Sequence, residues 1–247
     1  MCGDNMRIDK FISERGIASR KEAAVSAKKG LLLVNGEPVK DVSRHINPEI
    51  DKVVFMNTEI VYRKHTFVML NKPEGYVSAT EDSRLPVVTE LLPLQLQRME
   101  LFPVGRLDRD TVGLMILTND GATAHRLLSP KKHVEKTYRF KCALPLPTEA
   151  EAAFREGITL LDGYECKSAV LALDSDRLGG EITLTEGKYH QIKRMIASFD
   201  NRVTYLERIS FAGIALDRTL TRGQWRYLTD AETEQLFSRD GREPQND

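Results

Sequence analysis

GRLDRDTVGLMILTNDG, residues 105 to 121, joins a charged start to an apolar run and ends in a polar turn. Arg106 and Asp108 stand two residues apart, so their side chains leave the same face if this segment is extended. A guanidinium beside a carboxylate favours the ionised form of the acid. An ionised Asp108 at the mouth of the buried strand expected over 112–118 is either a nucleophile or half of a structural ion pair. Composition alone favours the ion pair.

The order of residues in this stretch changes the interpretation. It resembles the catalytic motif of the pseudouridine synthases, whose essential Asp stands in GRLD ahead of a Thr, a Gly and a leucine-rich segment. The resemblance implies that Asp108 is the catalytic residue. Val112 departs from the motif, because many relatives carry Ser between the Thr and the Gly. Neither side chain is assigned chemistry, so the departure leaves the assignment of Asp108 unchanged.

Further strings match the same family in order and spacing. LNKPEGYVS, residues 70 to 78, resembles the KPxG motif, and EKTYRF, residues 135 to 140, resembles the KxY motif. The second implies that Tyr138 stacks on the target base, which suits a flat amphipathic ring. EGKYHQIKRMIAS, residues 186 to 198, implies that Lys193 pairs with Asp108 and that Arg194, which flanks it, binds RNA. Leu206 matches the apolar position that walls the base pocket.

Each of these strings also has a plainer explanation. KPEG makes a tight turn between strands whatever its other role. A lone Tyr138 is most often a half-buried sheet aromatic, and a lone Leu206 is most often core. The basic end of the helix that carries Lys193 would ordinarily face solvent. The order of all the strings along one chain favours the family.

The first 60 residues predict a small basic domain. Ile8, Phe11 and Ile12 have helical spacing, and SRKE at residues 19–22 is a capping box that opens a second helix, which Gly30 ends. Leu31 to Val34 reads as a strand, and Asn35-Gly36 is a strong hairpin signal. Residues 7–29 hold seven basic and three acidic side chains, a local charge of +4 within a chain of zero formal net charge.

This arrangement of two helices and a hairpin resembles the RNA-binding domain first described in ribosomal protein S-four. The resemblance rests on RIDKFI, SRKEA and VNGEPV in this chain. It implies that the basic side chains of the two helices contact RNA phosphates, and these are Arg7, Lys10, Arg20, Lys21 and Lys28. A solvated helix surface is the alternative for any one of these helices.

The overall composition argues against a membrane protein, a secreted protein and a metal-binding protein. The chain has 247 residues, 41% hydrophobic and 29% charged, as in ordinary globular proteins. No apolar run reaches the roughly 20 residues that span a bilayer, and the N-terminus has no apolar stretch of a signal peptide. Three cysteines without CxxC spacing suit a reducing cytoplasm, and neither they nor the five histidines have metal-ligand spacing. These features predict no membrane segment and no metal site, and we also expect no cofactor and a monomer.

The sequence predicts an α+β fold with a mainly antiparallel mixed sheet flanked by helices. Strands are expected near 67–70, 112–118, 137–142, 169–173, 181–185, 211–216 and 225–228. Helices are expected after Asp120, from about His190 to Ser198, and after the capping box Thr229 to Glu232. Residues 58 to 65 are expected to form a connector. The expected domains are 6–58 for RNA binding, 59–65 as linker, 66–237 for catalysis and 238–247 as a disordered tail.

The function implied by the resemblance is isomerisation of uridine to pseudouridine in ribosomal RNA. Two strings, MLNKPEGYVS and EGKYHQIKRM, resemble the small-subunit branch of the family, and the second carries Lys193 where large-subunit relatives usually have Arg. This resemblance favours a small-subunit (16S) target over a large-subunit one. Breaking the ribose–uracil bond needs an ionised carboxylate, as nucleophile or as base, and the family favours a glycal route. Arg106 would fill the space that the flipped base vacates or grip a phosphate. The alternatives are a non-catalytic RNA-binding assembly protein and an Asp-dependent hydrolase, for which no second carboxylate or metal-ligand set is evident.

Overall fold

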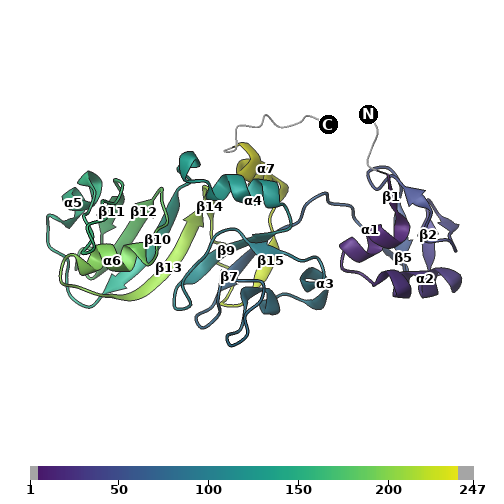
Figure 1. Cartoon of the computed structure of the whole chain (residues 1–247), viewed down its shortest axis with the longest axis horizontal. Helices are drawn as coiled ribbons and strands as arrows, with labels where there is room; N and C mark the ends of the chain where they lie inside the picture. The colour runs from purple at the N-terminus through teal and green to yellow at the C-terminus, as the bar shows by residue number, and fades with distance from the viewer. Residues whose placement is uncertain (1–4, 239–247) are drawn as a thin grey trace. The chain divides into compact units, whose positions relative to one another are not determined.

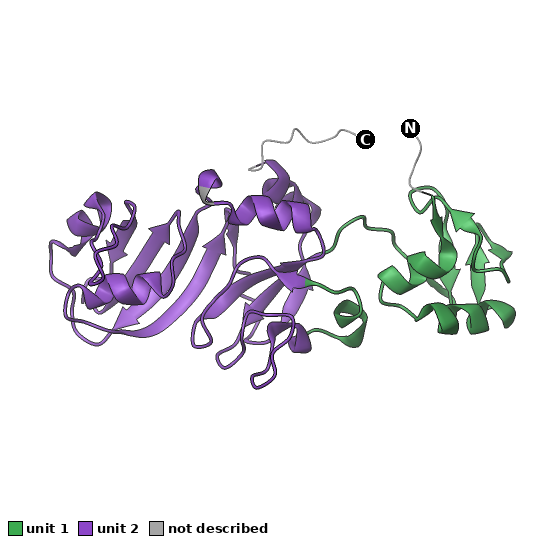
Figure 2. Ribbon diagram, viewed as in Figure 1, with its two compact units in different colours: residues 1–66, 92–101 green, residues 67–91, 102–247 purple. Residues whose placement is uncertain are grey.

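The computed structural model describes residues 5–238, which divide into two compact units (Figures 1 and 2). Unit 1 comprises residues up to 66 together with 92–101, and unit 2 comprises 67–91 together with the chain from 102. The expected domain limits, 6–58 and 66–237, concern parts with separate functions and stay predictions. The expected tail, 238–247, lies outside the described residues except for Ser238, which ends a helix.

Unit 1 packs two helices against short strands. Helix α1 (Ile8–Glu14) and helix α2 (Arg20–Lys28) bury Ile8, Phe11 and Ala23 against the strands. The predicted capping box opens α2, because the Ser19 hydroxyl accepts from the backbone N–H of Glu22 at 3.2 Å and the Glu22 carboxylate accepts from that of Ser19 at 2.7 Å. The other elements are β1 (Met6–Arg7), β2 (Leu32–Val34), β3 (Glu37–Pro38), β4 (His45–Ile46), β5 (Val53–Phe55), β6 (Thr58–Glu59) and α3 (Leu94–Gln97).

The strands of unit 1 contain one hairpin more than the sequence predicts. β2 and β3 join at Asn35 and Gly36, whose φ angles of 53° and 84° give the predicted primed turn. A second hairpin joins β5 to β6 through Met56 and Asn57, with φ angles of 50° and 65°. Residues 58 and 59, expected in a connector, are therefore strand. This hairpin was not predicted because Met56 gives no sequence signal for a left-handed turn.

Unit 2 is built on one nine-stranded sheet. Seven strands follow the order β11-β12-β10-β13-β9-β7-β15, while β14 pairs with β13 and β8 pairs with β9. The strands are β7 (Phe67–Lys72), β8 (Phe102–Pro103), β9 (Val112–Thr118), β10 (Lys136–Cys142), β11 (Val170–Leu173), β12 (Gly179–Leu184), β13 (Val203–Phe211), β14 (Ile214–Ala215) and β15 (Trp225–Tyr227). Every pairing is antiparallel except that of β13 with β9. The predicted α+β class with a mainly antiparallel mixed sheet is confirmed.

The parallel seam between β9 and β13 joins two antiparallel groups of strands (Figure 1). It consists of two residue pairs, Val112 with Glu207 and Gly113 with Arg208. Gly113 has a φ of 99°, and a Cβ there would lie 2.4 Å from the carbonyl oxygen of Arg208. Glycine therefore permits the close approach of the two backbones. The seam lies four residues after Asp108.

Helices cover the sheet at both groups of strands. Helix α4 (Gly121–Leu128) and helix α7 (Asp230–Ser238) bury Leu127 and Leu236 in a core with Met69, Leu114 and Ile116. The other helical segments are α5 (Ala150–Glu156), α6 (Gln191–Ala197) and the 3-10 turns η1 (Val88–Leu91) and η2 (Pro130–Lys132). No helix among residues 5–238 is long and apolar enough to cross a bilayer.

Two parts of unit 2 differ from the sequence-based expectation. The strand predicted at 211–216 is the turn of a hairpin, because Phe211 ends β13 and Ala212-Gly213, with φ angles of 52° and 77°, reverse the chain before β14. Helix α5 was not predicted, since it spans only seven residues and lacks a side-chain cap. The caps predicted at Asp120 and Thr229 do form.

Candidate active site

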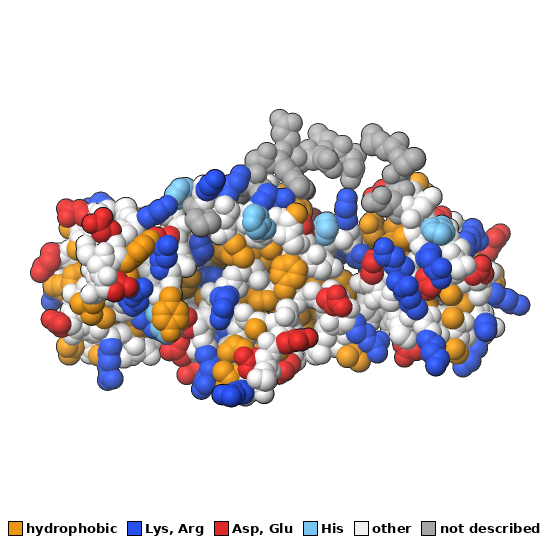
Figure 3. Space-filling view, in the orientation of Figure 1, with side chains coloured by type: hydrophobic (Ala, Val, Ile, Leu, Met, Phe, Trp, Pro, Cys, Tyr) orange, Lys and Arg blue, Asp and Glu red, His pale blue; other side chains and the backbone are white. Residues whose placement is uncertain are grey.

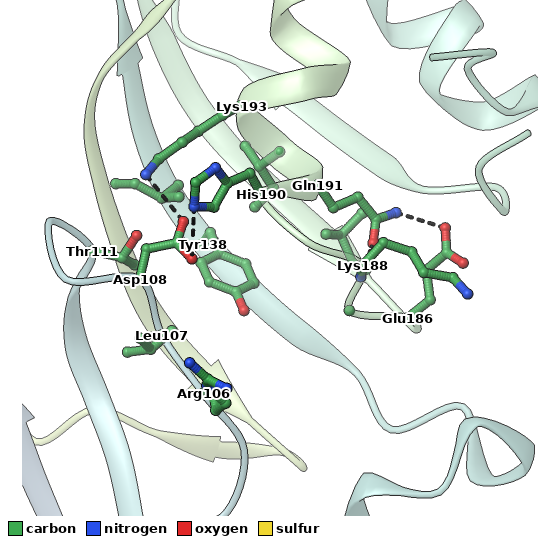
Figure 4. Close-up of a pocket in the computed structure, with 14 residues that line it drawn as sticks. Arg106, Leu107, Asp108, Thr111, Tyr138, Glu186, Lys188, His190, Gln191 and Lys193 are labelled. Atoms are coloured by element: carbon green, nitrogen blue, oxygen red, sulfur yellow. Dashed lines mark hydrogen bonds and ion pairs between the residues drawn. The ribbon is translucent and has the colours of Figure 1, made fainter. Parts of the chain in front are cut away.

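One pocket of unit 2 collects the residues that the sequence analysis placed in a catalytic site (Figure 4). It lies between the loop before β9, helix α6 and strands β10, β12 and β13, and it is open to solvent on one side. The predicted residues Arg106, Asp108, Tyr138, Lys193 and Leu206 all line it. The other lining residues are Leu107, Thr111, Leu184, Glu186, Gly187, Lys188, His190, Gln191 and Ile192. Arg194 is not among them, and its guanidinium pairs with Asp162.

A buried lysine holds the loop that carries Asp108. The Lys72 ammonium is fully buried and lies 3.1, 3.2 and 2.8 Å from the carbonyl oxygens of Asp108, Arg109 and Thr111, and 3.1 Å from that of Pro73. Burial lowers the pKa of Lys72 to about 8, against the opposing effect of nearby carboxylates. Carbonyl dipoles thus surround a charge that has little water. The loop is fixed through three of its backbone carbonyls, those of Asp108, Arg109 and Thr111.

Arg106 and Asp108 both line the pocket, but no ion pair joins them. Gly105, which precedes them, has a φ of 84°, and Leu107, which lies between them, exchanges two hydrogen bonds with the Ser78 hydroxyl, at 2.8 and 3.0 Å. The Asp108 carboxylate pairs with Lys193 and His190 in place of Arg106. Arg106 is exposed at the pocket and makes no ion pair within the described part of the chain.

The Asp108 carboxylate faces two basic side chains of the α6 segment (Figure 4). Lys193 Nζ lies 3.0 Å from Oδ2, and His190 Nε2 lies 3.5 Å from Oδ1. Lys193 Nζ also lies 2.6 Å from Asp110 Oδ1. One ammonium therefore serves two carboxylates. Asp108 lines the pocket with 29% of its side chain exposed, whereas Asp110 is 60% exposed and does not line it.

These ion pairs shift the pKa values of Lys193 and Asp110 toward their charged forms. Burial alone would lower the pKa of Lys193, but its hydrogen bonds and charge interactions with Asp110 and Asp108 raise it. Burial would likewise raise the pKa of Asp110, but the bond from Lys193 lowers it. Lys193 therefore stays protonated over the pH range of cells, and Asp108 has a permanent counter-charge.

Helix α6 is oriented by polar contacts at its start. His190 precedes it with a left-handed backbone, φ 48° and ψ 34°. The buried Gln191 amide donates to Glu186 at 2.6 Å and accepts from the backbone N–H of Lys188 at 2.9 Å. These bonds fix the first turn, from which Lys193 reaches Asp108.

The opposite wall of the pocket comes from adjacent strands. Tyr138 on β10 and Leu206 on β13 are 9% and 7% exposed. The register sets Tyr138 opposite Arg208, a fully buried cation whose Nε donates to the Leu114 carbonyl at 2.8 Å and whose guanidinium lies 5.0 Å from the Phe211 ring centre. Burial lowers the pKa of Arg208, and its interaction with Tyr138 opposes that effect. A flat ring whose neighbour in the sheet is a fixed cation is suited to holding a base.

Metal-binding groups are sparse in the region described. Within residues 5–238, no three or more His, Cys, Asp or Glu side chains gather closely enough to hold a metal ion. Cys142 and Cys166 are buried, and burial raises the pKa of both thiols, which disfavours the reactive thiolate.

A family model described as RNA pseudouridylate synthase matches residues 66–198, more than half of the chain and all of the pocket-lining loops up to α6. The chain belongs to the RNA pseudouridylate synthase family. A second model, the S4 domain, matches residues 6–49. The two matches confirm the family and the N-terminal RNA-binding domain that the sequence motifs indicated, and they make the synthase an isomerase that acts on RNA.

Relatives align with the synthase over nearly its whole length. The ribosomal small subunit pseudouridine synthase A of Haemophilus influenzae is 38% identical and covers 94% of this chain and 99% of its own. That of Escherichia coli K12 is 36% identical over 92% and 98%. An uncharacterised RNA pseudouridine synthase of Bacillus subtilis is 42% identical over 92% and 96%. A crystal structure of a pseudouridylate synthase is 37% identical, covers 94% and 99% of the two chains, and superposes with a TM-score of 0.66.

Four residues of the synthase site were not predicted from the sequence. Lys72 was placed in the KPxG motif and its turn without a role of its own, His190 was named only as the start of a helix, and Asp110 and Arg208 were not assigned to the site. Signals for two of them exist in the sequence. The DRD spacing puts two carboxylates two residues apart, and a charged residue in the middle of an otherwise strand-like TYLERISF segment indicates a buried partner.

Substitutions at Tyr138 separate stacking from hydroxyl chemistry in the synthase. We expect Tyr138→Phe to retain more activity than Tyr138→Ala, because stacking needs the ring and not the hydroxyl. Stacking of a base on an aromatic ring contributes roughly 1–3 kcal/mol, so Ala should cost about tenfold or more. Single-turnover rates on an rRNA fragment measure the difference. Equal rates for the Phe and Ala variants would remove Tyr138 from the base pocket.

Proposed function

We propose that the synthase isomerises one specific uridine of small-subunit ribosomal RNA, with Asp108 as the catalytic residue. The observation that carries the proposal is the Asp108 carboxylate, held in an RNA-isomerase pocket 3.0 Å from the Lys193 ammonium. The small-subunit target is supported by the names of full-length relatives at 36–38% identity. Ribosomal RNA as substrate implies a cytoplasmic enzyme, and the site chemistry uses no metal or cofactor in this proposal.

The reaction breaks one bond and makes another between the same two partners. The bond from ribose C1′ to uracil N1 breaks, the base rotates, and C1′ bonds to uracil C5. The proton on C5 is lost and N1 gains one, so atoms balance without an oxidant or reductant. The target base must leave its stack to enter the pocket, which costs a few kcal/mol. The exposed Arg106 is placed at the pocket to occupy the space that the base leaves or to bind a phosphate.

Asp108 acts on the ribose in this proposal. As a base it removes the C2′ proton while the uracil departs, which gives a glycal, and it returns the proton when C5 attacks C1′. As a nucleophile it would instead form an ester at C1′. Both routes need Asp108 to be ionised, and the Lys193 ammonium favours that form. We favour the glycal route. Tyr138 and Leu206 would hold the free uracil while it turns, since both flank the same space as Asp108.

Mapping of pseudouridine in ribosomal RNA tests the target. RNA from cells that contain the gene and from cells that lack it should differ at one small-subunit position. Restoring the gene should restore that position, and restoring it with Asp108→Asn should not. A change confined to large-subunit RNA would contradict the small-subunit assignment, and no change in either RNA would contradict the rRNA assignment.

Unit 1 supplies RNA affinity in this proposal. Of its five predicted phosphate-binding residues, two are already engaged in ion pairs. Arg7 lies 2.7 Å from Asp9, whose pKa the hydrogen bond from Arg7 lowers, and Lys10 lies 3.6 Å from Glu14. Figure 3 shows Lys and Arg side chains on the visible face of this unit, with Asp and Glu among them.

Replacing the other three cations tests phosphate contact. Arg20, Lys21 and Lys28 are exposed on α2 and make no ion pair within the described residues, so they are free to bind phosphate. Their joint replacement by Ala should weaken RNA binding and reduce the slope of log affinity against log salt by about 2, at roughly 0.7 for each phosphate. Lys52→Ala is the control, because Lys52 is paired with Glu59 at 2.7 Å. A slope equal to that of the unmodified protein would show that α2 does not contact phosphate.

A further inference from the structure

Tyr189 is exposed beside the pocket without a function in the chemistry described above. Its side chain is 76% exposed, which is far more than a tyrosine in a core or a sheet shows. Its two chain neighbours, Lys188 and His190, both line the pocket, whereas Tyr189 does not. The ring therefore stands at the rim, next to the space that receives the target base.

The Tyr189 ring is held in one orientation. It stacks on the His190 ring with centroids 3.8 Å apart and an interplanar angle of 20°. Consecutive side chains meet in this way because His190 has a left-handed backbone, φ 48°, which a residue with a Cβ adopts at a cost. The Tyr189 carbonyl also accepts from Arg194 Nη1 at 3.3 Å. Since His190 covers one face of the ring, the high exposure of Tyr189 comes from the other face.

The surroundings of this ring favour nucleic acid over an apolar partner. Lys188, which precedes Tyr189, is exposed, and Lys193, four residues after Tyr189, also lines the pocket and pairs with Asp108. Arg106 is exposed across the pocket. A fixed aromatic face among cations is the arrangement with which proteins bind single-stranded bases and the phosphates between them.

We propose that Tyr189 is a stacking platform for the base of the nucleotide next to the target uridine. This inference rests on the proposed function, because a flipped target leaves its neighbour without a stacking partner on one side. The neighbouring base stacks on the free face of Tyr189, and the His190 ring supports the opposite face. Binding is tolerant of base identity, since every base has a π face.

Substitutions at Tyr189 test the platform through KM. With small-subunit rRNA transcribed in vitro and labelled with tritium at uridine C5, Tyr189→Ala should raise KM about fivefold or more, and its loss should appear in KM more than in kcat. Tyr189→Phe, which keeps the ring, should stay within about twofold of the unmodified enzyme. Val170→Ala is the control, because Val170 is 66% exposed on the edge strand β11 and belongs to no site. An unchanged KM for Tyr189→Ala would overturn the platform and would point to a protein partner for this ring.

An abasic substitution identifies the occupant directly. A short transcript around the modified uridine is made with the neighbouring base removed on the 5′ side, on the 3′ side, or on neither. One abasic transcript should bind the unmodified enzyme as weakly as Tyr189→Ala binds the intact transcript, and the two losses should not add. Fully additive losses on both sides would overturn the assignment. Failure of the unmodified enzyme to release tritium from small-subunit rRNA would instead contradict the proposed function, which the KM comparison does not by itself test.

Discussion

Asp108→Asn is expected to bind RNA like the unmodified synthase and to lose isomerisation. The amide has nearly the shape of the carboxylate but cannot be ionised, so it can neither take a ribose proton nor attack C1′. Proton transfer by a positioned group contributes about 10²- to 10⁴-fold, and the loss should be at least of that order. The fold should persist, because the loop is fixed through the backbone carbonyl of Asp108 and not through its side chain.

The neighbouring carboxylate provides a matched control for this variant. Asp110 also pairs with Lys193, at 2.6 Å, but it is 60% exposed and outside the pocket lining. Asp110→Asn makes the same chemical change two residues away and should keep activity within about tenfold. Tritium release from 5-labelled uridine in rRNA measures both variants. Comparable activity of Asp108→Asn and the unmodified enzyme would rule out Asp108, and an inactive Asp110→Asn with an active Asp108→Asn would exchange the two roles.

Lys193→Met is expected to lose activity by about two orders of magnitude. Met has a similar length but no charge, so Asp108 loses the ammonium that lies 3.0 Å away. That ammonium favours the ionised form of Asp108 and fixes the orientation of its carboxylate. Misplacement of a catalytic group by about 1 Å can cost on the order of 10²-fold. Lys193→Arg keeps the charge and should stay within about tenfold.

Single-turnover rates at saturating RNA distinguish loss of the Lys193 charge from a general destabilisation of the fold. Lys141→Met is the control, because Lys141 is exposed on β10 and pairs in the sheet with Gly179, away from the pocket lining. Thermal unfolding of all three variants shows whether the fold is intact. A fully active Lys193→Met would leave Asp108 with His190 as its one basic partner within the described chain and would refute the proposed part of Lys193.

Much of the fold could be predicted because its signals are local. The Ser19 and Thr229 capping boxes, the Asp120 cap and the Asn35-Gly36 turn each depend on residues within three positions of one another. The turns at Met56-Asn57 and Ala212-Gly213 could not be predicted in the same way. There, tertiary contacts hold Met56 and Ala212 in a backbone conformation that their own side chains disfavour.

In the candidate site, the family motifs identified some residues, whereas others could be found only from the three-dimensional structure. The motifs led to Asp108, Tyr138, Lys193 and Leu206, which line one pocket although they lie up to 98 positions apart in the numbering of the chain. The pairing expected between Arg106 and Asp108 does not form, because the Asp108 carboxylate is engaged by Lys193 and His190, which follow it by more than 80 residues. Lys72 could not be predicted as the residue that holds the loop, since its ammonium contacts carbonyl oxygens 36 to 39 residues away and carbonyls leave no mark in a sequence.

The position of β15 in the sheet also determines when the sheet can be completed during translation. All six residues of β7 are buried, and β7 lies between β9 and β15. β9 leaves the ribosome soon after β7, but β15 begins only at Trp225, 153 residues after β7 ends at Lys72. Until β15 has been translated, β7 is therefore an open edge, the kind of strand that pairs with other chains. The group of strands next to the Asp108 loop is completed only when Trp225 to Tyr227 have left the ribosome.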